Sequence, residues 1–130
     1  MKDDDVSLWV RKAEGDFRIA NREFKIGEDE SYDAACFLAQ QCVEKLMKAL
    51  LIRNRVPPPK SHNLVLLQNL LIQVCPTWHA TFDDLELLTR AAHAFRYPGE
   101  FATHAQAREA LRICSNLRLQ ALTLLNLVLD

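Results

Sequence analysis

Cationic and polar side chains recur at helical intervals directly after a sharp turn near the end of the chain. The series consists of His104, Arg108, Arg112 and Ser115, spaced by four, four and three residues, and Arg96 and Tyr97 precede the turn at Pro98 and Gly99. A helix N-terminus attracts anions through its free amide hydrogens and its dipole. The pattern therefore predicts a phosphate-binding site formed by Arg96, Tyr97, His104, Arg108 and Arg112. The alternative is a solvated basic face whose cations form salt bridges with the second helix.

Arg96 and His104 are also the residues that could cleave RNA. Cleavage without a metal ion needs one group that deprotonates the 2′-hydroxyl and another that stabilises the crowded phosphorane. A histidine titrating near neutral pH and an arginine fork suit these two tasks. Because the chain carries one copy of each residue at this place, a ribonuclease would depend on a symmetric dimer.

A second candidate surface lies on the helix expected between residues 31 and 57. Its polar face carries Gln41, Glu44, Lys45 and Lys48, yet Phe37 falls in the middle of that face. An exposed aromatic ring indicates a partner surface. We therefore predict a partner or dimer surface formed by Phe37, Gln41, Lys45 and Lys48. The alternative is that the last helix or a loop of the same chain covers Phe37.

The remaining reactive side chains favour structural roles. The four cysteines stand singly among apolar residues and are expected to be buried free thiols. His62 is expected to donate to a nearby carbonyl. His79 and His93 show no spacing with carboxylates or cysteines that would hold a metal, and Pro76 argues against a shared helical face for Cys75 and His79. We expect neither a metal nor a cofactor.

The elements that position these residues are helices almost throughout. The first is expected to end at Gly27, and the second to begin near Ser31 and stop at the prolines from residue 57. A third follows a cap at Ser61 and closes at Cys75-Pro76, and a fourth, capped by Thr81, buries Phe95 before the Pro-Gly break. Thr103 and Gln106 form a capping box for the fifth. Short connections favour an all-α, antiparallel up-and-down bundle of about five helices.

Length and composition limit the classes of protein to consider. A chain of 130 residues with 49% hydrophobic residues is expected to form a single domain over residues 1–130. Its net charge of −1 excludes a generally basic nucleic-acid-binding protein, so a phosphate site must be a local patch. No stretch is long and apolar enough for a signal or a membrane span, and we expect a cytoplasmic protein.

Three segments resemble a known family. They are Tyr32 to Leu51 (YDAACFLAQQCVEKLMKALL), Ser61-His62-Asn63-Leu64, and Arg96-Tyr97-Pro98-Gly99-Glu100. In order and spacing they are similar to HEPN domains. The resemblance implies an antiparallel helical bundle that often forms a homodimer, with a groove at the interface that binds nucleotide or RNA. It also implies, as a partner, a small nucleotidyltransferase encoded nearby, in a toxin–antitoxin or substrate-binding pair.

The chain departs from the pattern of the ribonuclease members of this family. They carry an arginine, four to six intervening residues and a histidine, whereas seven residues separate Arg96 from His104 here. Members with an adenylylated tyrosine carry it just after that histidine, where this chain has Ala105, Gln106 and Ala107. The favoured hypothesis is therefore a non-catalytic module that binds phosphates or docks a nucleotidyltransferase. The alternatives are a metal-independent endoribonuclease toxin and a purely structural helical bundle.

Overall fold

The computed structural model describes residues 3–93 and 97–127, which contain five helices and no strand. The helices are α1 (Asp3–Ile26), α2 (Asp29–Arg53), α3 (Leu64–Val74), α4 (Phe82–His93) and α5 (His104–Leu124). The prediction of an all-α bundle is confirmed. Two predictions fall outside the described residues. They concern Phe95, expected on the fourth helix, and Arg96, expected in the phosphate site.

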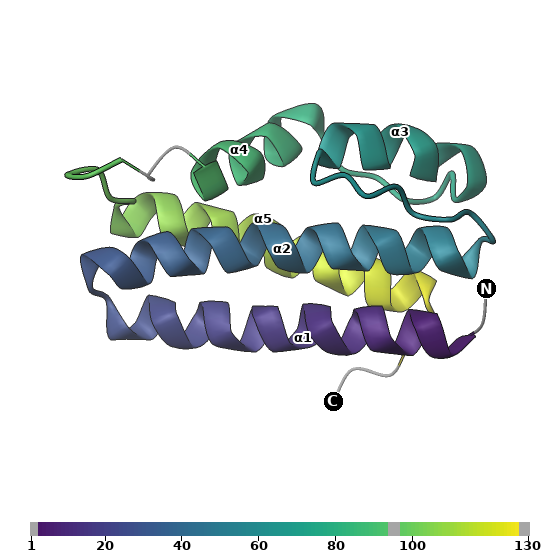
Figure 1. The fold of residues 1–130 in the computed structure, drawn as a ribbon, viewed down its shortest axis with the longest axis horizontal. Coiled ribbons are helices and arrows are strands. Elements are labelled where there is room, and N and C mark those ends of the chain that lie inside the picture. Colours follow the sequence, from purple (N-terminus) through teal and green to yellow (C-terminus); the bar gives the residue numbers. More distant parts are fainter. Residues whose placement is uncertain (1–2, 94–96, 128–130) are drawn as a thin grey trace.

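The long second helix is the centre of the bundle. α1 packs along one side of α2, while α3 and α4 cover the side facing away from α1, and α5 runs beside α2 and contacts α1 and α4 as well (Figure 1). No contact joins α1 to α3 or α4 in the described part of the chain. α2 therefore separates two surfaces of the molecule, one between α1 and α5 and one between α3 and α4.

Local signals explain most of the helix ends. Gly27 ends α1 with a left-handed φ of 72°, a conformation that glycine adopts without strain. The hydroxyl of Thr81 accepts a hydrogen bond from the Asp84 amide at 3.1 Å. Thr103 and Gln106 exchange both hydrogen bonds of a capping box at the start of α5. These three predictions are confirmed.

One predicted helix cap needs correction, and one helix start lies slightly earlier than Ser31. α3 is capped by Asn63, whose side-chain oxygen accepts hydrogen bonds from the amides of Val65 and Leu66, and the Ser61 hydroxyl accepts from the Asn63 amide instead. Asn63 caps because it lies one residue before the first helical residue. α2 starts at Asp29, two residues before Ser31, because acidic residues in the first turn favour the positive end of the helix dipole.

The core is apolar and centred on α2. Leu46, Met47, Leu50 and Leu51 of α2 are almost fully buried, and they belong to one cluster with Leu residues of α3, α4 and α5. Trp78, from the α3–α4 connection, is also buried, and its indole nitrogen donates to the Gln68 side chain at 2.9 Å. No helix in the described part of the chain is both long and apolar enough to cross a membrane.

Candidate functional site

His104 begins α5 and faces the end of α1. Its ring centroid lies 4.8 Å from that of Phe24 in α1 and 5.7 Å from that of Tyr32 in α2, the latter in an edge-on arrangement. Arg108 follows one helical turn later and is exposed. The two residues therefore lie on the α1 side of α5, at the end of the bundle where α1 passes into α2.

Arg112 forms a local ion pair. Its guanidinium donates to the Glu109 carboxylate through two hydrogen bonds of 3.0 and 2.6 Å. This contact raises the pKa of Arg112 and lowers that of Glu109. The expected alternative, a salt bridge with the second helix, is wrong for Arg112, because an acid within one turn of the same helix is the nearer partner. Tyr97, which was also predicted to belong to the phosphate site, is 72% exposed.

A groove of about 600 Å³ runs between α1 and α5. The helices are antiparallel there, since Phe24 contacts His104 while Glu14 contacts Arg118. Charged and polar side chains of both helices line it, together with one aromatic ring: Glu14, Phe17, Arg18, Asn21, Arg22, Lys25 and Arg118. The lining therefore contains four cations and one carboxylate, that of Glu14. Arg118 already neutralises this carboxylate through two hydrogen bonds of 2.8 and 3.0 Å.

Sequence reasoning missed these basic residues of α1. Arg18, Arg22 and Lys25 are spaced by four and three residues, so that they share one helix face. All three are exposed, and within the described residues none of them is hydrogen-bonded or ion-paired. The spacing was a usable signal, but only the packing of α1 against α5 brings this row beside Arg118 and the His104–Arg108 side of α5.

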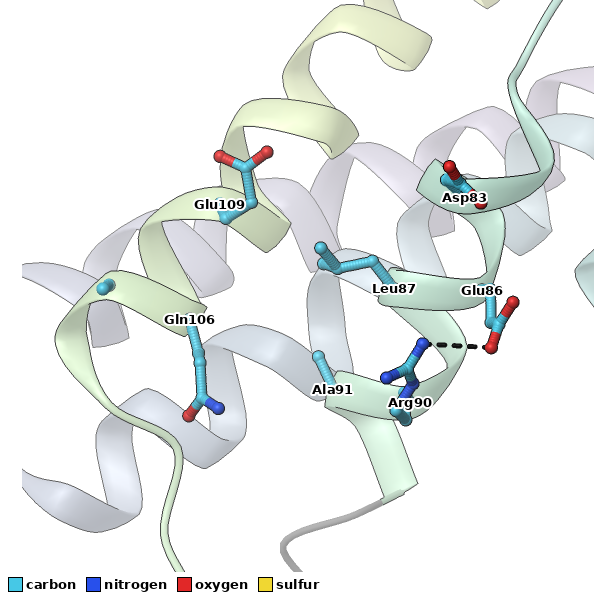
Figure 2. Close-up of a pocket in the computed structure, with 8 residues that line it drawn as sticks. Asp83, Glu86, Leu87, Arg90, Ala91, Gln106 and Glu109 are labelled. Carbon is cyan, nitrogen blue, oxygen red and sulfur yellow. Dashed lines mark hydrogen bonds and ion pairs between the residues drawn. The ribbon is translucent and has the colours of Figure 1, made fainter.

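The groove on the other side of α5 is acidic. It holds about 520 Å³ between α4 and α5, and Figure 2 shows its polar side chains around the apolar Leu87 and Ala91. Its lining holds three carboxylates, those of Asp83, Glu86 and Glu109, and one guanidinium, that of Arg90. Arg90 pairs with Glu86 at 3.0 Å and Arg112 pairs with Glu109, so Asp83 leaves the lining with a net negative charge. An excess of carboxylates repels phosphate, so the two sides of α5 differ in the charge of the ligand that they favour.

The predicted partner surface on α2 is only partly exposed. Phe37 is 38% exposed and Gln41 is half-buried, while Lys45 forms an ion pair with Asp16 of α1. Lys48 is 5% exposed, which corrects its placement on an open polar face. Its long stem carries the ammonium to the Glu44 carboxylate at 3.1 Å, and 5.5 Å from the centre of the Trp9 ring.

His62 has a partner that the sequence did not predict. Its Nδ1 lies 3.0 Å from both carboxylate oxygens of Glu44, not beside a carbonyl. Glu44 is 2% exposed and also accepts from Lys48 and, at 3.2 Å, from Gln40. Gln40 donates a further hydrogen bond to the His62 carbonyl at 3.4 Å. A buried polar network on α2 therefore fixes both the backbone and the ring of His62.

The thiols are placed much as predicted. Cys36, Cys42 and Cys114 are free and buried, whereas Cys75 is partly exposed at the end of α3. In residues 3–93 and 97–127, no group of three or more histidine, cysteine, aspartate or glutamate side chains is arranged to hold a metal ion.

Comparison with known proteins gives a consistent family and fold. A family model described as the HEPN domain matches residues 6–121. The crystal structure of TT1696 from Thermus thermophilus superposes with a TM-score of 0.70 at 24% identity, covering 89% of this chain and 94% of that one. ST0689, described as an archaeal HEPN homologue, superposes with a TM-score of 0.66 at 24% identity, covering 92% and 96%. No curated protein matches the chain.

Proposed function

This chain belongs to the HEPN domain family, and from that premise we propose that it is a phosphate-binding module whose ligand, a nucleotide or RNA, binds in the groove between α1 and α5. The observation that carries the proposal is the set of four cations in that groove, Arg18, Arg22, Lys25 and Arg118, against the single acid Glu14. Such a local excess of positive charge attracts phosphates even though the whole chain has a net charge of −1.

The surroundings of the groove support the same ligand. His104 and Arg108 extend the row of basic side chains on α5, and the Thr103 cap places the N-terminus of α5 at the same end. The ring of Phe17 lies under the Arg118 guanidinium, 4.4 Å from its central carbon, which holds that cation in place. Arg96, Tyr97 and Arg112, the other members of the predicted site, are not needed for this proposal.

Charge removal in the groove tests the proposal. We expect Arg18→Gln with Arg22→Gln to weaken the binding of a short labelled single-stranded RNA about tenfold or more, measured by fluorescence anisotropy at low salt. The matched control is Lys60→Gln with Arg90→Gln, which removes the same charge elsewhere on the surface. Equal affinities for the two double variants would contradict the assignment of the groove.

The partners implied by the family also belong to this proposal. A homodimer, or a complex with a small nucleotidyltransferase, would use the α2 surface around Phe37 and Gln41, because an aromatic ring that is 38% exposed next to polar groups suits a protein interface. Phe37→Glu should then shift the molar mass measured by light scattering from dimer to monomer. A wild-type protein that is monomeric at high concentration would contradict the homodimer.

The endoribonuclease alternative has one supporting observation, the exposed position of His104 beside Arg108. Within the described residues, His104 makes no hydrogen bond or ion pair with an ionisable group, and its ring packs on Phe24 and Tyr32. The geometry therefore favours phosphate binding over catalysis for this residue.

A further inference from the structure

The groove between α4 and α5 has an apolar floor that is open to solvent. α4 buries Leu85, Leu88 and Ala92 in the core of the bundle. Leu87 and Ala91 pack against that core and also line the groove, where both remain partly exposed (Figure 2). The core therefore holds this apolar floor in place from one side and leaves its other side uncovered. An apolar surface with a polar rim is typical of a docking site for another protein.

The rim of the groove carries carboxylates from both helices. Asp83 and Glu86 come from α4, and Glu109 comes from α5. Glu86 and Glu109 pair with Arg90 and Arg112 of their own helices, but these four side chains are 43% to 70% exposed. Exposed pairs of this kind contribute little, so an incoming cation can share or replace either arginine. Within the described residues, Asp83 forms no ion pair. The rim therefore favours a ligand with positive charge.

The dimensions of the groove fit a short helix. Asp83 and Ala91 are eight positions apart, which corresponds to about 12 Å, or two turns, along α4. The volume of about 520 Å³ is large enough for several aliphatic side chains. The described part of the chain contains no strand, so an extended peptide finds no sheet edge there to which it could add. An amphipathic helix that lies between two helices places aliphatic side chains at i, i+3, i+4 and i+7 on such a floor.

We propose that the α4–α5 groove docks a cationic amphipathic helix of a partner protein. The aliphatic side chains of that helix lie on Leu87 and Ala91, and its lysine or arginine side chains bind the carboxylates of Asp83 and Glu109. The observation that selects this occupant is charge complementarity: an apolar floor alone fits any hydrophobic segment, whereas the acidic rim disfavours an acidic segment or a nucleic acid.

This interaction goes beyond the binding of phosphates. The α1–α5 groove favours an anion and lies on the other side of α5, so one chain can hold an anionic ligand and a cationic partner at the same time. The docking surface is also distinct from the α2 surface around Phe37 and Gln41, because neither residue lines the α4–α5 groove.

A model peptide tests the charge of the occupant. The probe is a fluorescein-labelled helical peptide of leucine and lysine, with leucines at i, i+3, i+4 and i+7, and the control peptide has glutamate in place of lysine. With the full chain, fluorescence anisotropy should show saturable binding of the lysine peptide and no binding of the glutamate peptide. Asp83→Asn with Glu109→Gln should weaken the binding of the lysine peptide about tenfold.

The matched control is Asp29→Asn with Glu30→Gln, which removes the same charge from an exposed site at the start of α2 and should leave the affinity unchanged. Equal affinities for the two double variants would overturn the proposal, and so would the absence of saturable binding to the wild-type chain.

Two neutral variants test the apolar floor. Leu87→Ala should weaken the binding of the lysine peptide about fivefold. Because Leu87 also packs against the core, the second variant is Ala105→Gln, at an exposed position in the lining, which fills part of the groove without affecting the core and should weaken binding as well. Unchanged affinity in both variants would overturn the assignment of the floor.

Light scattering tests a different occupant, a second copy of this chain. Self-association of the wild-type chain that Leu87→Ala abolishes, without binding of the lysine peptide, would overturn the proposal in favour of that occupant. Arg18→Gln with Arg22→Gln should bind the lysine peptide as the wild type does, so the outcome is independent of the RNA assay of the α1–α5 groove.

Discussion

Arg118 of α5 donates two hydrogen bonds, of 2.8 and 3.0 Å, to the carboxylate of Glu14 in α1, 104 residues earlier in the chain. The two side chains are 21% and 28% exposed, so solvent screens the pair only in part. A planar fork is needed to make both bonds and to stack on Phe17. We therefore expect Arg118→Lys to lower the free energy of unfolding by about 1 kcal/mol, measured by urea denaturation.

The control for Arg118→Lys is Arg112→Lys. Arg112 makes a similar two-bond contact with Glu109, but both side chains are largely exposed and lie on the same helix. Exposed pairs of this kind contribute little. If Arg112→Lys lowers the free energy of unfolding as much as Arg118→Lys does, the loss of the guanidinium alone determines the effect. The position of Arg118 between α1 and α5 would then not matter.

The fold could be predicted from sequence because its helix ends are encoded locally. Gly27, Thr81 and Thr103 act through bonds to residues within four positions, and the spacing of apolar residues identifies the buried faces. The cap of α3 was missed because Ser61 and Asn63 are both good caps two residues apart, and only the backbone decides between them.

The candidate site could be predicted only in part, because it depends on how helices pair. The row of Arg18, Arg22 and Lys25 resembles any solvated helix face until α5 places Arg118 beside it. Glu44 and Lys48 were read as surface residues because periodicity reports the direction of the Cβ atom, not where a long side chain ends. The partner of His62 lies eighteen positions earlier and leaves no local signal.

Two glycines of the first hairpin should respond oppositely to alanine. Gly15 lies inside α1, and a Cβ there would meet nothing within 4 Å, so Gly15→Ala should raise the free energy of unfolding by about 0.5–1 kcal/mol. Gly27 has a φ of 72°, and its Cβ would lie 3.3 Å from the Tyr32 hydroxyl. Gly27→Ala should cost about 1–2 kcal/mol. Thermal denaturation of both variants checks the signs, and a stabilised Gly27→Ala would contradict the left-handed turn.

The buried network makes Glu44 a sensitive position for stability. Glu44→Ala removes the partner of Lys48 and leaves an unpaired ammonium inside the bundle, so we expect a loss of about 3–5 kcal/mol in urea denaturation. The double variant Glu44→Leu with Lys48→Met removes both charges and should be far less destabilised. If the single and double variants lose the same stability, the ion pair is not the cause.

The cysteines should differ strongly in reactivity. A hydrogen bond with Cys114 and burial hold the pKa of Cys42 well above its ordinary value, and burial, with Asp33 nearby, raises the pKa of Cys36 to about 11. The thiolate is the reactive form, so a raised pKa slows alkylation at neutral pH. We expect iodoacetamide to modify Cys75 first in the native chain and the three buried thiols only after unfolding, as read by mass spectrometry. Fast labelling of Cys75→Ser would contradict this order.

The salt dependence of RNA affinity tests whether the cations of the α1–α5 groove contact phosphates, because each such contact releases bound counterions. If the four cations of the groove each neutralise one phosphate, the logarithm of the affinity for single-stranded RNA should fall with the logarithm of salt concentration with a slope of about −3. Arg18→Gln with Arg22→Gln removes two of these contacts and should reduce the slope by about 1.4, whereas Lys60→Gln with Arg90→Gln should leave it unchanged. Anisotropy titrations over a series of salt concentrations measure both slopes. A weaker affinity with an unchanged slope would mean that the two arginines support the groove without contacting phosphate, since the number of released counterions would be the same.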